Sequence, residues 1–132
     1  MQFFFLALTV HSAFFAILML QSGMDKLFHY KDNLAWLKGH FANTFLGSSV
    51  PALLLVLTCL ELGCGLLFST ALVSSFFDPL NFNWFQQAYL VSGLTFLSLF
   101  LGQRIAKDYA GAASLAGYFV FWFCGPLLVY LQ

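Results

Sequence analysis

Glu61 is the first candidate for a chemical role, because it is the one carboxylate in an apolar run from Val50 to Val73. An ionisable side chain costs at least a few kcal/mol inside a bilayer, so it is expected to face other helices and to have a partner there. His11 is the one histidine of another apolar run, residues 2–21. A carboxylate and an imidazole in contact could relay a proton or hold the polar head group of a quinone.

Counting residues along the apolar runs places several polar side chains at a similar depth. His11 and Glu61 each lie about ten residues from the polar segment between their runs, which at about 1.5 Å per residue brings them to one level. We therefore predict a polar layer across the molecule. Its expected members are Glu61, His11, Ser92, Tyr118 and Thr58.

This predicted layer has more than one interpretation. It could be a structural network that fixes how the helices align, with each hydrogen bond worth about 1 kcal/mol in lipid. It could instead be a proton relay or the polar end of a pocket that lipid-soluble molecules reach. A third outcome is that the helices align differently and His11 does not reach Glu61.

A second group of charged residues lies in the polar segments that follow two of the apolar runs. Asp25 and Lys26 could pair with each other or with Arg104 and Asp108. Such charges commonly anchor helix ends at the level of the lipid head groups. The alternative is that they bind anionic lipid or a partner subunit. The full set is Asp25, Lys26, Arg104, Lys107 and Asp108.

The sequence lacks the motifs that mark several classes of enzyme and binding protein. Gly-x-Ser-x-Gly, a Gly-rich phosphate loop, His-Glu-x-x-His and Cys-x-x-Cys are all absent, and no metal site is predicted. The net charge is zero without a basic run, so nothing indicates nucleic acid binding. Cys59, Cys64 and Cys124 lie within apolar runs, where packed thiols are expected.

The composition indicates a membrane protein. The chain is 61% hydrophobic and 8% charged, with a mean hydropathy of +0.88, whereas a soluble domain has about 25% charged residues. A helix needs about 20 apolar residues to cross a bilayer. The predicted fold is a single all-α domain, residues 1–132, that forms a bundle of four transmembrane helices. The spans are expected at residues 2–21, 50–73, 86–103 and 110–131.

A short amphipathic helix is predicted between the first two spans, over residues 33–46. Asp32 is its candidate N-cap and Gly47 its expected stop. Ser49 is the candidate N-cap of the second span, with Pro51 in its first turn. Small residues allow helices to approach closely in lipid. The candidate helix-packing glycines are Gly63, Gly65, Gly111 and Gly117.

The basic residues predict the orientation in the membrane. All five, Lys26, Lys31, Lys38, Arg104 and Lys107, lie in or beside the first and third polar segments. In membrane proteins, Lys and Arg are more frequent in the segments on the cytoplasmic side. This rule places the two segments in the cytoplasm and both termini outside it.

Three stretches of the sequence resemble the DoxX family of small four-helix membrane proteins. They are Ser22-Gly-Met-Asp-Lys-Leu-Phe28, Pro51 at the start of the second span, and Leu60-Glu-Leu-Gly-Cys-Gly-Leu-Leu67. The resemblance covers most of the chain and implies a bacterial inner-membrane protein. Some members of that family are linked to membrane oxidoreductases, including the smaller membrane subunit of a thiosulfate:quinone oxidoreductase. Others are linked to redox-stress complexes or to the assembly of membrane proteins.

These observations together predict an accessory subunit or partner of a larger membrane complex. If that complex uses quinone, it would be a respiratory or redox complex. One alternative is a stand-alone oxidoreductase or proton-relay module that binds quinone or lipid and acts through Glu61. The other is an assembly chaperone for membrane proteins. The sequence does not decide whether the chain is an enzyme, and it identifies no cofactor. A bound quinone or lipid would be compatible with it. The expected partners are the lipid bilayer and other membrane-protein subunits.

Overall fold

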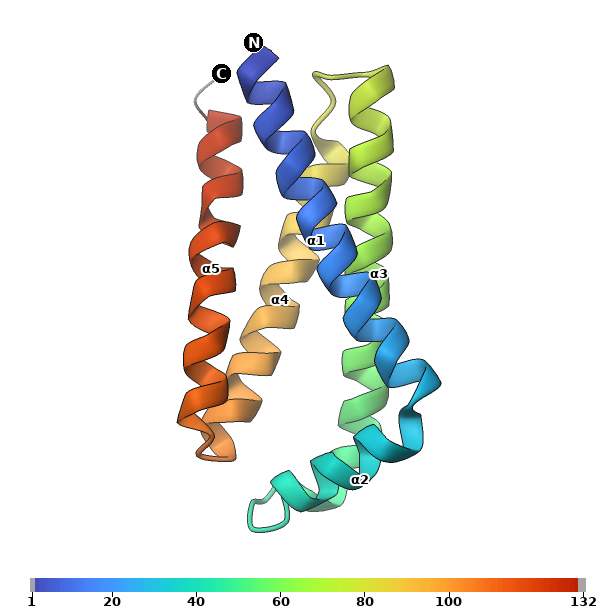
Figure 1. Cartoon of the computed structure of the whole chain (residues 1–132), viewed down its shortest axis with the longest axis vertical. Helices are drawn as coiled ribbons and strands as arrows, with labels where there is room; N and C mark the ends of the chain where they lie inside the picture. Colours follow the sequence, from blue (N-terminus) through green and yellow to red (C-terminus); the bar gives the residue numbers. More distant parts are fainter. Residues whose placement is uncertain (1, 131–132) are drawn as a thin grey trace.

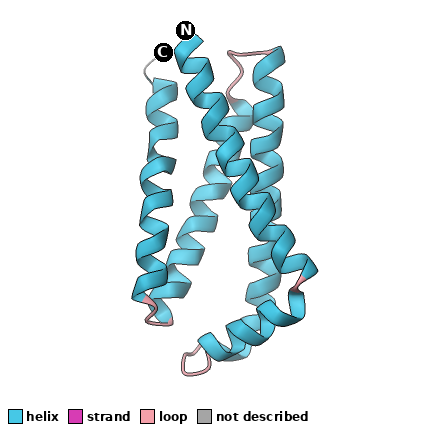
Figure 2. Cartoon of the chain, in the orientation of Figure 1, coloured by secondary structure: helices cyan, strands magenta, loops and turns pink. Residues whose placement is uncertain are grey.

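The chain folds into helices joined by short connections, as the computed structural model shows for residues 2–130 (Figures 1 and 2). The four long helices are α1 (Gln2–Phe28), α3 (Val50–Phe77), α4 (Asn83–Ile105) and α5 (Tyr109–Tyr130). A shorter helix α2 (Tyr30–His40) and a 3₁₀ turn η1 (Gly47–Ser49) connect α1 to α3. The four long helices are long and apolar enough to cross a membrane. The predicted all-α four-helix bundle is thereby confirmed.

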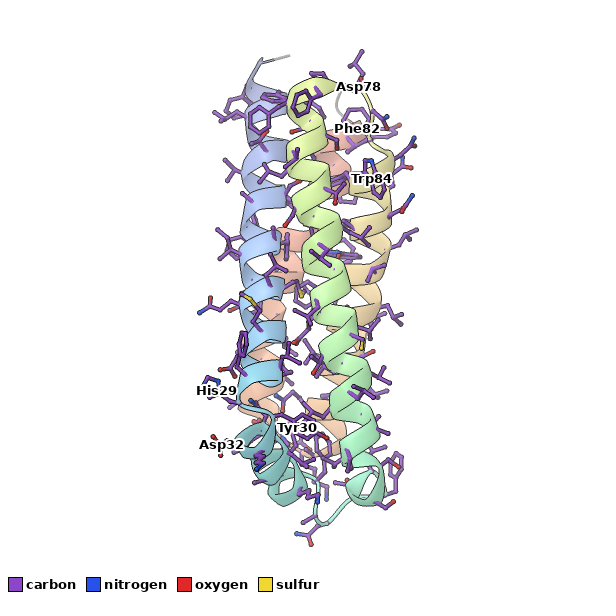
Figure 3. All side chains as sticks on the ribbon, turned by 90° about the vertical axis from the view of Figure 1, so that its right-hand side faces the viewer. His29, Tyr30, Asp32, Asp78, Phe82 and Trp84 are labelled. Atoms are coloured by element: carbon purple, nitrogen blue, oxygen red, sulfur yellow. The ribbon has the colours of Figure 1, made fainter. Side chains whose placement is uncertain are left out.

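The long helices run up and down, so that the two ends of the bundle differ in what they contain. The start of α1, the end of α5 and the α3–α4 connection lie at the top of Figure 1, and α2 and the α4–α5 turn lie at the bottom. The side view shows the same division: Asp78, Phe82 and Trp84 lie near the upper end, and His29 and Asp32 near the lower end (Figure 3). Helix α1 packs mainly on α3 and α3 on α4, while α5 makes weaker contacts with α4 and α1.

The core lies among α1, α3 and α4 and is built from phenylalanine rings. Phe15, Phe68 and Phe96 are each at most 1% exposed. The ring of Phe15 stacks on Phe68 at 5.4 Å between centroids and meets the edge of Phe96 at 5.8 Å. Aromatic rings fill a large volume and prefer these geometries. In contrast, the buried residues of α5 are only Ala112 and Gly125.

The long helices extend beyond the predicted spans. Helix α1 continues past residue 21 to Phe28, α3 continues past residue 73 to Phe77, and α4 begins at Asn83 rather than at residue 86. Hydropathy marks the part of a helix that fits the hydrocarbon layer, whereas backbone hydrogen bonds continue into the polar flanks. The predicted end of the fourth span, at residue 131, lies outside the described residues.

The short helix between α1 and α3 is displaced from its predicted position. It covers Tyr30–His40 instead of residues 33–46, and Asp32 lies in its first turn rather than at its N-cap, which is His29. The hydrogen bonds from His29 N to Asp25 O and from Asn33 N to His29 O carry the chain from α1 almost directly into α2. Asn33 therefore lies inside the helix, and Gly47 opens the 3₁₀ turn instead of ending α2.

Candidate functional site

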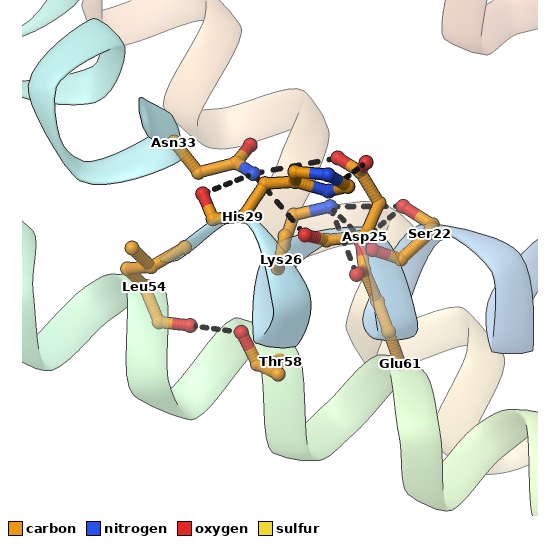
Figure 4. Close-up of polar contacts among 8 residues, drawn as sticks. All are labelled: Ser22, Asp25, Lys26, His29, Asn33, Leu54, Thr58 and Glu61. Atoms are coloured by element: carbon orange, nitrogen blue, oxygen red, sulfur yellow. Dashed lines mark hydrogen bonds and ion pairs between the residues drawn. The ribbon is translucent and has the colours of Figure 1, made fainter. Parts of the chain in front are cut away.

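Glu61 lies at the centre of a closed polar network between α1 and α3. Its side chain is 2% exposed, and Lys26 Nζ lies 2.9 Å from Oε2. The hydroxyl of Ser22 donates a hydrogen bond to Glu61 Oε1 at 3.2 Å and accepts one from Lys26 Nζ at 2.8 Å (Figure 4). Oε2 has no aligned hydrogen-bond donor, so its contact with Lys26 is an ion pair. Three side chains thus bind one another across two helices.

The local sequence explains why these groups meet. Ser22 and Lys26 are four residues apart, which places both on one face of α1. Two glycines bring the backbones of α1 and α3 close together at this level. A Cβ atom on Gly23 would lie 2.8 Å from the side chain of Leu62, and one on Gly65 would lie 2.9 Å from the backbone nitrogen of Leu20. The helices can approach this closely only because both positions lack a side chain.

The network ties Glu61 to one end of the bundle. Lys26 lies two residues before the end of α1, and its side chain is 16% exposed. A long basic side chain near a helix end can reach the membrane surface with its charge. The ion pair therefore neutralises the buried carboxylate and links it to the surface through a single side chain.

The predicted contact between His11 and Glu61 is wrong. His11 is 1% exposed, and its ring lies among Phe15, Phe68, Phe85 and Phe121, with centroids 4.8 to 6.1 Å away. Among residues 2–130, neither ring nitrogen has a hydrogen-bond partner. On α5 the imidazole lies against Gly125, where an added Cβ atom would be 2.9 Å from Cε1 and Nε2.

The error arose from the length of α1. Because α1 continues to Phe28, His11 lies 17 residues from that end, whereas Glu61 lies 11 residues after Val50. The difference corresponds to about 9 Å along the helix axes. The spacing of Ser22 and Lys26 on one helical face was the sequence signal that could have identified the true partners.

The remaining predicted members of the polar layer do not assemble around Glu61. Ser92 accepts a hydrogen bond from Trp122 Nε1 at 2.8 Å, joining α4 to α5. Thr58 donates to the carbonyl of Leu54 in its own helix at 2.7 Å. The Tyr118 ring stacks on Phe96 at 6.2 Å. The predicted single layer is thus replaced by separate contacts at different places in the bundle.

Trp122 is a packing residue that the sequence pattern did not reveal. Its indole stacks on Tyr89 with centroids 4.0 Å apart, and a Cβ atom on Gly93 would lie 2.9 Å from the indole. Gly93 directly follows Ser92, the acceptor of the indole N–H. A glycine beside a serine in an apolar run was the available signal for an approaching large ring.

The charged groups at the α2 end pair differently from the prediction. Asp25 contacts His29 Nδ1 at 3.1 Å, and the Asp108 carboxylate caps α5 by accepting a hydrogen bond from Gly111 N at 2.8 Å. Asp108 also lies 3.8 Å from His40 Nε2. The Arg104 guanidinium lies 4.8 Å from the centre of the Tyr109 ring. Among the described residues, Asp25 and Lys26 thus pair neither with each other nor with Arg104 or Asp108, which excludes those two possibilities.

Lys107, the last of the charged residues singled out in the sequence, lies in the turn between α4 and α5. It has a φ of 60°, in the left-handed region that non-glycine residues seldom adopt.

The four candidate packing glycines have different surroundings. Gly65 is confirmed as a point of close helix approach, with Leu20 against it. Gly111 lies against the side chains of Asp108 and Gln103 rather than against a neighbouring helix backbone. A Cβ atom on Gly63 or Gly117 would have no atom within 4 Å among the described residues. These last two positions are not used for packing within the chain.

The thiols do not form a redox pair in residues 2–130. All three cysteines are free, and only Cys64 is buried, so the prediction that Cys59 and Cys124 are packed is wrong. The same part of the chain contains no group of three His, Cys, Asp or Glu side chains that could hold a metal ion.

Comparison with known proteins does not assign a role to this site. No family model, curated protein or solved structure matches this chain.

Proposed function

We propose that this chain is a DoxX-like integral membrane protein that acts as an accessory subunit or partner of a larger complex in the bacterial inner membrane. The motif around Lys26 and the motif around Glu61 support the family assignment, because they are the two stretches that meet in the polar network. The four apolar helices support a multi-pass protein. In this role the ion pair is a tether that keeps α1 and α3 aligned.

The observation that carries the proposal is a small-residue face of α5 that the chain itself leaves uncovered. We call it the α5 face. It is exposed along its length and consists of Ala110, Ala113, Ser114 and Gly117. No atom lies within 4 Å of a Cβ built on Gly117. Lipid-facing positions are commonly filled by large apolar side chains, as on the exposed faces of α3 and α4.

Small residues spaced by three and four positions are instead the mark of a helix–helix contact in lipid. The four members of the α5 face have this spacing on one side of the helix. Among the described residues, α5 is also the long helix with the fewest buried residues. A transmembrane helix of another subunit would fit against this face.

Copurification from native membranes tests the proposal. The tagged chain is extracted in a mild detergent, and proteins bound in stoichiometric amount are identified by mass spectrometry together with an optical spectrum for haem, flavin or copper. Gly117→Leu should abolish recovery of the partner, because the larger side chain blocks close helix approach. Ala52→Leu is the matched control, since it makes the same kind of change at an exposed position of α3.

Each outcome of this experiment is informative. Loss of the partner with Gly117→Leu and its retention with Ala52→Leu would support the subunit role. A stable homo-oligomer without another protein would contradict it, and so would a partner that survives both substitutions. Transient capture of immature membrane proteins would favour the assembly-chaperone alternative instead.

A further inference from the structure

A cavity of about 360 Å³ lies between α2, α3 and α4, at the end of the bundle opposite the α3–α4 connection. This volume falls in the range of small-molecule sites, about 300–1,000 Å³. Leu54, Leu57 and Leu60 of α3 form one wall, and Leu99 of α4 lies opposite. The α5 face proposed above for a partner helix contributes nothing to it, so the two sites are independent.

The polar groups of the cavity are gathered where α2 meets the end of α4. His40 Nε2 lies 3.2 Å from Gln103 Oε1, and Trp36 stacks on the His40 ring at 4.5 Å between centroids. Both His40 and Gln103 line the cavity. The side chain of His40 is 17% exposed, and Asp108 behind it lies 3.8 Å from Nε2. The His40 imidazole, held by Trp36 and Asp108, and the Gln103 amide thus form one polar end of a mainly apolar cavity.

The lining also indicates the charge of what would bind. Among the described residues that line the cavity there is no Lys, Arg, Asp or Glu. Arg104, which follows the lining residue Gln103 in α4, lies over the Tyr109 ring. An anionic head group would find no counter-charge in the lining and would meet the carboxylate of Asp108 close behind His40.

The rim of the cavity faces the side where lipid chains lie. Val56 and Leu101 line it and are 57% and 60% exposed, and both belong to helices that could span a membrane. A molecule dissolved in the bilayer can therefore enter from the side, with its chain between α3 and α4. Gly102 keeps the space open, since a Cβ atom there would have only Phe41 near it, at 3.5 Å.

We propose that this cavity binds an uncharged amphiphile, whose oxygen-bearing head group contacts His40 and Gln103 while an apolar chain lies along the leucines of α3. Both an isoprenoid-type quinone and a neutral glyceride have this chemistry. The site is distinct from the Glu61 network and does not depend on the subunit role.

Titration calorimetry on the detergent-solubilised full chain tests the proposal with three probes: decyl-benzoquinone, dioctanoylglycerol and anionic dioctanoyl-phosphatidylglycerol. At least one neutral probe should bind, and the anionic probe should bind at least about tenfold more weakly. Gly102→Leu, which fills the cavity, should weaken binding of the neutral probe at least about tenfold. Leu97→Phe adds bulk at an exposed position of α4 outside the cavity and should leave the affinity unchanged.

A second pair of variants covers the case in which Gly102→Leu does not fold. Gln103→Leu removes the amide at the polar end, whereas Gln87→Leu makes the same change at an exposed position of α4 outside the cavity. Only the first should weaken binding. Selective binding of the quinone or of the glyceride identifies the source of the ligand. Equal binding of the anionic probe, binding of none, or equal effects of the matched variants would overturn the proposal.

Discussion

Lys26 and Glu61 form a buried ion pair between α1 and α3. A buried ion pair gains little over apolar side chains of the same size, because both charges lose their hydration. Removing one partner is different, since it leaves the other charge alone in a low-dielectric environment. Ser22, which hydrogen-bonds both groups, reduces the cost of burying the pair.

Lys26→Met should therefore lower the free energy of unfolding by about 3 kcal/mol. The double variant Lys26→Met with Glu61→Gln should recover most of this loss, because no charge remains buried. The measurement is a double-mutant cycle on the detergent-solubilised protein. His11→Ala combined with Glu61→Gln is the control pair and should be additive, since these side chains make no contact. Coupling between His11 and Glu61, or none between Lys26 and Glu61, would refute the assignment.

His11 is a buried polar ring that lacks a hydrogen-bond partner among the described residues. Pro126 lies inside α5 and has no N–H, so the carbonyl group four residues earlier, that of Trp122, lacks its helical donor. The ring of His11 lies close to Gly125, the residue before this proline, where a Cβ atom would come within 2.9 Å of the imidazole. The glycine therefore leaves room on α5 for a polar side chain of α1.

At the scale of elements, the sequence predicts the four long helices well and their alignment poorly. Runs of about 20 apolar residues are a direct signal for a long apolar helix, and all four such runs form a helix that is long and apolar enough to cross a membrane. The ends of the helices carry no comparable signal, because Ser22 to Phe28 is polar in sequence and still helical. The shift of seven residues at the end of α1 was enough to give Glu61 the wrong partner. Local patterns do not record which faces of two helices meet.

The close contact of α1 and α3 leads to a prediction about glycine. Gly65→Ala should destabilise the protein by about 1–3 kcal/mol, because the added Cβ atom would lie 2.6 Å from Leu20 Cγ and 2.9 Å from its backbone nitrogen. Gly63→Ala is the matched control two residues away, where the added atom meets nothing within 4 Å. It should be neutral or slightly stabilising, since alanine favours helix more than glycine does. Equal effects of the two substitutions in detergent unfolding would argue against the packing.

At the scale of the whole molecule, the basic residues are gathered at one end of the bundle. Lys26, Lys31, Lys38, Arg104 and Lys107 belong to the end of α1, to α2, and to the end of α4 with its following turn. The opposite end carries the aromatic α3–α4 connection (Figures 1 and 3), together with the start of α1 and the end of α5 (Figure 1). Such an asymmetry favours one orientation in a bilayer, with the basic end in the cytoplasm.

This orientation is expected to be measurable by labelling cysteines at the two ends. Asp78→Cys and Asp32→Cys replace the same residue type at exposed positions of opposite ends, in a background of Cys59→Ser, Cys64→Ala and Cys124→Ser. In spheroplasts, a maleimide that does not cross membranes should react at position 78 and spare position 32, because the excess of basic residues holds the α2 end inside. Detergent should expose both positions equally. The reverse labelling pattern would place both chain ends in the cytoplasm, and the cavity beneath α2 would then open near the outer surface of the membrane.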